Sequence, residues 1–282
     1  MHQETVAALA SVADRKIANL DRSLGSHLVL SALAGMYVGI GVVLVFTIGA
    51  PLAAAGSPVT KLVMGASFGV ALTLVVFAGA ELFTGNNMIF SLGVLAGKTR
   101  ISDLAANWAW TWIGNLAGSA LLALIVVKGG TFDGPIFRDF VVSATSTKMN
   151  LPWLQLFLRA ILANWLVCLA IWQSAKTTSD AAKLGLIFWC LFAFIASGFE
   201  HSIANMTLLT MGLLLPHGPD VTLLGLARNL LATTLGNIVG GCLFVAFPYW
   251  LSSVDRIGLL SRRPESWRSS PAVTQQQETS AS

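Results

Sequence analysis

Charged residues are scarce in this chain of 282 residues. Lysine, arginine, aspartate and glutamate make up only 11% of it, whereas hydrophobic residues make up 55%. The mean hydropathy is +0.73. A soluble domain of this length needs far more charged side chains on its surface. The shortage of charge therefore excludes an ordinary soluble protein and predicts an integral membrane protein.

Cysteine is also rare, and the alternating pattern of membrane β-strands is lacking. The three cysteines, Cys168, Cys190 and Cys242, lie inside apolar runs without metal-ligand spacing. They are typical of small buried hydrophobic residues, so we expect no metal and no cofactor. A β-barrel would need short segments of alternating polarity. We therefore predict an all-α membrane protein whose helices satisfy their own backbone groups.

Six hydrophobic runs cover residues 28–50, 62–96, 108–127, 153–173, 184–215 and 223–251. About 20 apolar residues are enough to cross a bilayer as a helix, so residues 28–251 are predicted to form a six-helix transmembrane domain. The second and fifth runs are too long for one ordinary span. Both carry polar residues and glycines near their middle, so we expect these two helices to be interrupted.

Two further regions flank the transmembrane domain. In residues 1–27, Val6, Leu9, Ala13, Ile17 and Leu20 share one helical face, as in an amphipathic helix that lies on the membrane or caps a pore. The first apolar run begins too late for a cleavable signal peptide, so we expect this segment to remain. Residues 252–282 form a polar tail that we expect to be disordered.

The basic residues favour one orientation in the membrane. Six spans place both ends on one side, and lysine and arginine accumulate on the cytoplasmic side of membranes. We therefore expect both termini in the cytoplasm and the chain in the cytoplasmic (inner) membrane. This orientation puts 11 of the 17 basic residues inside. They are Arg15, Lys16, Arg22, Lys98, Arg100, Lys176, Lys183, Arg256, Arg262, Arg263 and Arg268.

The two interrupted runs resemble each other. The string GAELFTGNNM begins at Gly79 and GFEHSIANM begins at Gly198, with glycine, glutamate and asparagine recurring 119 residues apart. A second echo, GNLAG from Gly114 and GNIVG from Gly236, recurs at 122 residues. Two units of three spans have opposite orientations, and inverted repeats place their binding site where broken helices meet at the midplane. The breaks therefore predict the functional site, although kinks without a ligand remain the alternative.

Three ionisable residues lie near the centre of apolar runs: Glu81, Glu200 and His201. An ionised group at that depth costs on the order of 3 kcal/mol, so each needs a partner or a function. We expect the glutamates to hold orphaned backbone N–H groups at the breaks. His201 corresponds in the repeat to Leu82, so one half offers a proton donor where the other offers a hydrophobic wall. We expect this histidine to act on the substrate.

The strings GAELFTGNNM, NWLVCLAIW, ASGFEHSIANM and LGNIVGG resemble those of the formate/nitrite transporter family. The resemblance covers residues 28–250 and is closest to the nitrite-transporting branch. It implies an aquaporin-like fold and a homopentamer with one pore in each subunit. Ala80 and Trp165 depart from the formate-type pattern. The preferred anion therefore stays open between nitrite and formate, followed by hydrosulfide and short carboxylates.

The resemblance also implies which residues lie along the pore. The outer side and the centre would be lined by Phe68, Phe194 and His201. Hydrophobic constrictions would be formed by Leu72, Leu82, Phe83 and Val167. Polar positions near the pore would be Asn164, Asn205 and Asn237, with Thr84 offering its hydroxyl to the anion or gating the inner mouth. An outer vestibule that attracts anions would contain Lys148.

These residues predict a pore for small monovalent anions, chiefly nitrite, operating as a channel or as a proton-coupled transporter in the lipid bilayer. We expect no nucleic-acid partner. A water or glycerol channel would carry two Asn-Pro-Ala motifs, which the sequence lacks. An intramembrane hydrolase would need a hydroxyl and an imidazole that converge beside an oxyanion site. The neighbours His201 and Ser202 point in different directions on a helix, so we expect no enzyme.

Overall fold

The computed structural model describes residues 2–253, and every regular element in that range is a helix. The N-terminal helix α1 spans Gln3–Arg22. The first half of the fold continues with α2 (Leu24–Ala54), α3 (Thr60–Ser67), α4 (Gly69–Ala78), α5 (Phe83–Leu95) and α6 (Ile101–Lys128). The second half contains α7 (Pro135–Asn150), α8 (Trp153–Ser174), α9 (Asp180–Ala196), α10 (Ser202–Leu214), α11 (Leu223–Gly241) and α12 (Phe247–Ser253). A π-helical turn, Cys242–Ala246, joins α11 to α12. The expected disordered tail lies, from residue 254 onward, outside the described residues.

Five helical stretches within residues 2–253 are long and apolar enough to cross a membrane: Leu24–Ala54, Thr60–Ala78, Ile101–Lys128, Trp153–Ser174 and Leu223–Ser253. The remaining apolar run falls slightly short because α9 has 17 residues before its break and α10 has 13 after it. The predicted order of six hydrophobic segments, with the second and fifth interrupted, is therefore confirmed. The second segment is divided into α3–α4 and α5, and the fifth into α9 and α10.

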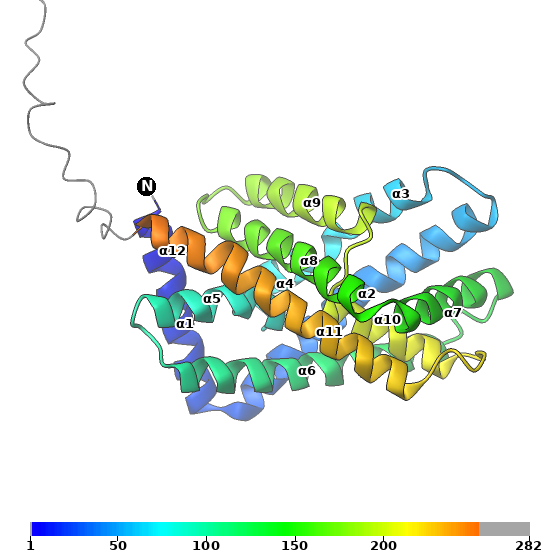
Figure 1. The fold of residues 1–282 in the computed structure, drawn as a ribbon, viewed down its shortest axis with the longest axis horizontal. Helices are drawn as coiled ribbons and strands as arrows, with labels where there is room; N and C mark the ends of the chain where they lie inside the picture. The colour runs from blue at the N-terminus through cyan, green and yellow to red at the C-terminus, as the bar shows by residue number, and fades with distance from the viewer. Residues whose placement is uncertain (1, 254–282) are drawn as a thin grey trace, which may run out of the picture.

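The two halves run in opposite directions through the bundle (Figure 1). Helices α2 and α6 begin at the end that carries α1, whereas α8 and α11 run back toward that end, where α12 lies next to α1. Helix α2 packs extensively along α6, and α8 packs in the same way along α11. The expected inverted repeat is thus a pair of matched helix pairs, with α5 and α10 between them.

The N-terminal helix lies across one end of this bundle (Figure 1). Its buried residues include Val6, Leu9, Ala13 and Leu20 on the face recognised in the sequence, while Ile17 is partly buried. This face packs against α5 and α12. The position places α1 over the end of α5, where it covers part of the bundle.

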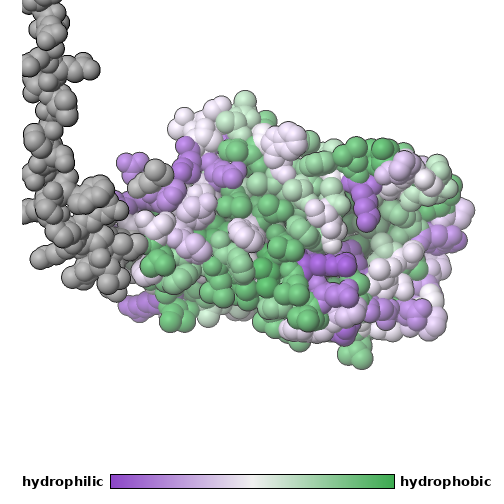
Figure 2. Space-filling model, turned by 45° about the horizontal axis from the view of Figure 1, so that its top comes forward, coloured by the Kyte–Doolittle hydropathy of each residue, from purple (hydrophilic) through white to green (hydrophobic). Residues whose placement is uncertain are grey.

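The surface has an apolar middle and polar ends, as expected of a protein that spans a membrane. Figure 2 shows hydrophobic residues over the middle of the visible face, with hydrophilic residues gathered toward its two ends. Large exposed apolar side chains include Leu121, Ile125, Trp189, Leu231 and Leu243. Such exposure would be unfavourable in water, whereas lipid or a neighbouring subunit covers it at no cost.

Glycine allows the long helices of each half to approach closely. A Cβ atom on Gly118 of α6 would overlap the backbone carbonyl of Ala32 on α2. The equivalent Gly240 of α11 would meet the carbonyl of Ile161 on α8 in the same way. Small residues are typical of such contacts between membrane helices. The backbone separation of each pair therefore depends on the lack of a side chain.

Replacing Gly118 with alanine is expected to destabilise the protein. Overpacked cores typically lose about 1–3 kcal/mol, and here the added carbon meets backbone that cannot rotate away. Gly185→Ala is the matched control, because a Cβ on this α9 glycine meets nothing within 4 Å. Thermal unfolding in detergent should show a lower midpoint for Gly118→Ala and no loss for Gly185→Ala. Equal midpoints would contradict the proposed close contact.

Candidate functional site

The interrupted helices break in the same way. After α4, Gly79 adopts a left-handed conformation with φ of +75°, and after α9, Gly198 does so with φ of +71°. Such values are accessible to glycine without strain. Three further residues follow before α5 or α10 begins. Each break therefore leaves several backbone groups without partners inside their own helix.

Two asparagines from neighbouring helices satisfy these backbone groups. The Asn115 side-chain oxygen accepts the Phe83 N–H at 3.0 Å, and its amide donates to the Glu81 carbonyl at 2.9 Å. In the second half, Asn237 accepts the Ser202 N–H at 2.9 Å and donates to the Glu200 carbonyl at 3.1 Å. Each amide also donates to a carbonyl of the adjacent long helix, on Ser31 or Ala160. These two asparagines fix both breaks.

The side chains of the break glutamates have a different role from the one expected. Glu81 accepts hydrogen bonds from Lys16 at 2.6 Å and Asn86 at 3.0 Å. The expectation that its carboxylate would hold loop N–H groups is wrong, because the Glu81 N–H bonds the Leu30 carbonyl and Asn115 accepts the N–H of Phe83. The carboxylate is instead neutralised by a lysine.

The second half repeats this ion pair. Glu200 accepts hydrogen bonds from Lys148 at 2.7 Å and Asn205 at 2.8 Å. The side chain of Glu200 is only 3% exposed and that of Lys148 is 23% exposed. Lys148, which the resemblance placed in an anion-attracting vestibule, is thus tied to a buried carboxylate. Asn205, expected beside the pore, completes this network with Asn229 at 2.9 Å.

His201 contacts Thr84 across the two breaks. Its Nε2 lies 3.0 Å from the Thr84 hydroxyl oxygen, while its Nδ1 accepts the Ala204 backbone N–H at 3.2 Å. An uncharged ring with Nδ1 as acceptor carries its hydrogen on Nε2. The Nε2–H therefore donates to Thr84, and one residue from each half forms this polar pair.

Asn164 of α8 connects the two halves through hydrogen bonds in the buried interior. Its amide donates to the Thr84 carbonyl at 3.2 Å, to Asn87 at 3.1 Å and to the Asn237 carbonyl at 2.6 Å. Its side chain is fully buried. This asparagine therefore supports Thr84 and Asn237 within the packed interior.

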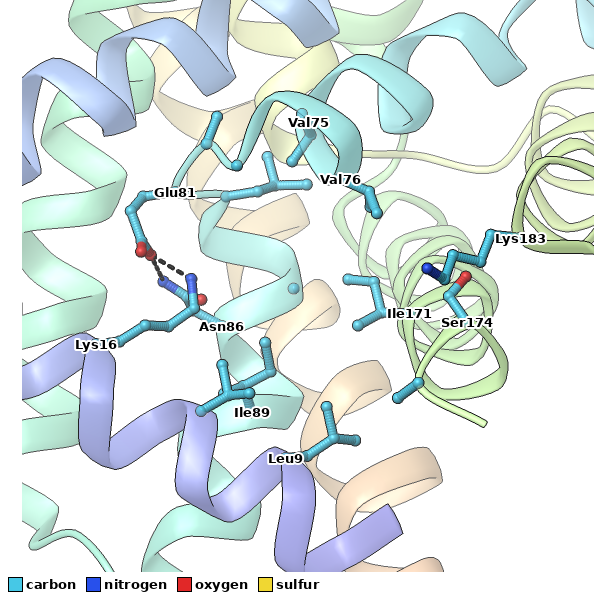
Figure 3. Close-up of a pocket in the computed structure, with 16 residues that line it drawn as sticks. Leu9, Lys16, Val75, Val76, Glu81, Asn86, Ile89, Ile171, Ser174 and Lys183 are labelled. Atoms are coloured by element: carbon cyan, nitrogen blue, oxygen red, sulfur yellow. Dashed lines mark hydrogen bonds and ion pairs between the residues drawn. The ribbon is translucent and has the colours of Figure 1, made fainter. Parts of the chain in front are cut away.

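A cavity of about 490 Å³ opens at the end of the bundle that carries α1 (Figure 3). We call it the terminal mouth. Lys16, Glu81 and Asn86 lie on one wall and Lys183 on the opposite wall, with apolar side chains such as Ile171 between them. A second cavity of about 490 Å³, the opposite mouth, lies at the other end and contains both Lys61 and Lys148. The molecule is therefore hollowed from both ends.

Two small cavities lie between the mouths. The central cavity, of about 10 Å³, shares Leu82 with the terminal mouth. It shares Phe68, Phe194 and His201 with an intermediate cavity of about 50 Å³. The intermediate cavity shares Lys148 with the opposite mouth. Because neighbouring cavities have lining residues in common, the four cavities lie in a series through the protein.

Apolar side chains close this line near the centre. The central cavity is lined by Leu72, Leu82 and Val167, each at most 4% exposed. Phe68 and Phe194 meet edge to face with ring centroids 5.6 Å apart, and Phe194 lies 5.8 Å from the His201 ring. The histidine is the one polar side chain among the residues that line the central cavity.

Three residues singled out in the sequence do not line the central cavity: Phe83, Trp165 and Ala80. Phe83 packs against Trp108 and lines an outer apolar groove between α6 and α11, so it points away from the line of cavities. Of the two departures from the formate-type pattern, Trp165 packs against Phe244, and Ala80 lines the terminal mouth. Of these two residues, only Ala80 therefore faces one of the two mouths.

The sequence also contains one Gly-x-Ser-x-Gly string, at residues 65–69, of the form found in hydrolases. The Ser67 hydroxyl donates to the Val63 carbonyl at 2.9 Å, four residues earlier in chain order. The His201 ring pairs with Thr84 instead. These contacts give the string no nucleophile–base arrangement.

Comparison with known proteins places this geometry in context. A family model described as "Formate/nitrite transporter" matches residues 3–251. The "Nitrite transporter NirC" of Salmonella typhimurium is 45% identical over 253 residues, which are 90% of this chain and 89% of that protein. A solved "FNT family ion channel" has a TM-score of 0.85 and 44% identity, covering 89% of this chain and 99% of its own. A "Pentameric formate channel with formate bound" has a TM-score of 0.73 and 31% identity, covering 82% of this chain and 98% of its own.

Breaking the Lys148–Glu200 pair from one side is expected to destabilise the protein. Lys148→Met leaves a buried carboxylate without its cation, which costs about 3–5 kcal/mol, whereas Lys148→Met combined with Glu200→Gln should recover most of that loss. Arg138→Met is the control, because Arg138 and its partner Asp139 are 36% and 69% exposed. Thermal unfolding in detergent measures all three. A Lys148→Met protein as stable as Arg138→Met would show that the pair is not structural.

Proposed function

Because this chain belongs to the formate/nitrite transporter family, we propose that it carries small monovalent anions, chiefly nitrite, across a membrane through the line of cavities. This proposal is carried by the series of four cavities with common lining residues, because the series extends between the two polar ends of the bundle. The likeness to a nitrite transporter over most of both chains favours nitrite. The likeness to a formate channel makes formate the second candidate.

The apolar centre is where a passing anion would lose the most hydration free energy. A cavity of about 10 Å³ holds roughly one water molecule at most, so an anion must lose most of its hydration shell there. Burying a bare charge without partners is very costly. The Nε2–H of His201, already directed at Thr84, is the donor available to replace lost water.

The tautomer of His201 bears on whether a proton moves with the anion. Since Nδ1 accepts the Ala204 N–H, the ring holds one hydrogen, on Nε2. Giving up that hydrogen would leave an imidazolate, so this arrangement favours hydrogen bonding to the anion. Transfer of a proton to form neutral nitrous acid first needs a ring protonated at both nitrogens, which requires the bond from Ala204 to break.

The same comparison supports a proposal for the assembly of the protein and its orientation in the membrane. The solved formate channel is pentameric, and the exposed apolar side chains of this chain would be covered by lipid or by neighbouring subunits. We propose a homopentamer with one pore in each subunit. In the orientation expected from the sequence, 11 of the 17 basic residues lie on the side of the two termini, so we propose that both termini face the cytoplasm of an inner membrane.

Replacing His201 tests the proposed role of the ring. His201→Phe keeps an aromatic ring but removes the donor, and one hydrogen bond to a charged group is worth about 1.5–3 kcal/mol, so nitrite flux should fall about ten- to a hundred-fold. The pH dependence of the remaining flux should also change. Stopped-flow uptake of nitrite and formate into proteoliposomes across pH measures both effects.

Two controls accompany this measurement. Thr84→Val removes the hydroxyl that orients the ring, whereas Thr84→Ser retains it, so the first should impair nitrite flux more than the second. Glycerol-induced swelling tests the rival neutral-solute channel. Unchanged nitrite flux in His201→Phe at every pH would defeat the proposed role of the ring, and wild-type flux of glycerol but neither anion would defeat the proposed function.

A further inference from the structure

The terminal mouth continues the walls of the central cavity. On α8, Val167 lines the central cavity, and Ile171, one helical turn further along the same face, lines the mouth. At the first break, Leu82 lines both cavities, and Gly85 follows it into the mouth. The wall formed by α4 contributes Val75 to the mouth. We call Val75, Gly85 and Ile171 the terminal ring.

The inverted repeat gives two of these residues larger counterparts on the other side of the centre. At the 119-residue spacing of the breaks, Gly85 corresponds to Ala204. Val75 corresponds to Phe194 at the same spacing. Both counterparts line the intermediate cavity. With a glycine and a valine in place of an alanine and a phenylalanine, the terminal ring has the smaller side chains at these two positions.

Ile171 is the exception, because it is larger than its counterpart. The carbonyls of Ser31 and Ala160 accept the two break asparagines and lie 129 residues apart in the sequence. At this spacing, Ile171 corresponds to Val42, which lines the intermediate cavity. A Cβ atom on Gly85 would lie 2.7 Å from Cδ1 of Ile171. The one carbon that isoleucine has beyond valine therefore lies over the glycine, and Figure 3 shows this side chain at the wall of the mouth.

The wall opposite Ile171 is backbone that is held in place. Asn115 accepts the N–H of the first residue of α5, and the Thr84 carbonyl accepts the Asn164 amide at 3.2 Å. The first turn of α5, which contains Gly85, cannot retreat without breaking these buried hydrogen bonds. Isoleucine is β-branched and has one strongly preferred χ1 rotamer in a helix. The contact between Gly85 and Ile171 therefore has a nearly fixed width.

We propose that the contact between Gly85 and Ile171 sets the size of the anion that the pore passes. This inference rests on the proposed function and assigns its size limit. Nitrite and formate are bent ions of three heavy atoms, and acetate carries one methyl group more. One carbon more or less in an apolar site changes selection about ten-fold or more. A gap that one side-chain carbon narrows therefore favours nitrite and formate over acetate and larger carboxylates.

Uptake of nitrite and of acetate into proteoliposomes tests this proposal through the ratio of the two fluxes. Ile171→Val removes the carbon that lies over Gly85, so it should raise acetate flux relative to nitrite flux about ten-fold. Ile89→Val is the matched control, because it removes the same carbon from the terminal mouth one turn further along α5, outside the terminal ring. This control should leave the flux ratio unchanged.

A compensating pair of substitutions shows whether the two residues act through their contact. Gly85→Ala adds a carbon where Ile171→Val removes one, so the double variant should return the flux ratio toward that of the wild type. Gly85→Ala alone should lower the flux of both anions. Thermal unfolding in detergent identifies the folded variants. If Gly85→Ala does not fold, Ile171→Ala replaces it, and this variant should pass still more acetate than Ile171→Val.

The outcomes separate this inference from the proposed function. Nitrite flux in wild type, with equal flux ratios in Ile171→Val and Ile89→Val, would overturn the inference and leave the proposed function intact. Wild-type protein that passes acetate as fast as nitrite would also overturn it, as would a folded double variant with the flux ratio of Ile171→Val. Wild-type protein that passes neither nitrite nor formate would overturn both.

Discussion

The structure depends on satisfying backbone polar groups where two helices break inside an apolar bundle. Lipid offers no hydrogen bonds, so each such group must find a partner in the protein. Asn115 and Asn237 supply these partners by bonding the chain on both sides of each break and the neighbouring long helix. This arrangement works only if the long helices lie close together, as Gly118 and Gly240 allow. The close packing of the long helices and the geometry of the breaks therefore depend on each other.

The scaffold is symmetric, but the lining of the pore is not. Lys16, Glu81 and Asn86 have counterparts of the same residue type in the second half. The contact between His201 and Thr84 instead uses one residue from each half, and their repeat counterparts are the apolar Leu82 and Ile203. Residues that hold the breaks are thus duplicated, while residues that face the pathway differ. At the central cavity, the lining therefore offers one polar side chain, His201, in an otherwise apolar wall.

Much of this arrangement could be predicted from the sequence, because hydrophobic run length and matched glycines are local signals. The spans, the breaks and the central histidine follow from them. The partners of the glutamates could not be predicted in this way, because Lys16 lies in a separate surface helix and meets Glu81 only in the folded protein. Phe83 shows a second limit. It begins α5 next to Leu82, yet one helical step turns it toward Trp108 and away from the cavities.

The same constraint determines which part of the pore can move. The backbone at each break is held by several hydrogen bonds from two other helices, so shifting it would leave buried groups without partners. The constriction itself is made of apolar side chains, Phe68, Leu72, Leu82, Val167 and Phe194, which lose only packing contacts when they rotate. Opening the central cavity of about 10 Å³ for an anion therefore requires side-chain rotation within a fixed frame. We propose that the breaks hold His201 rigidly and that the apolar side chains around it act as the gate.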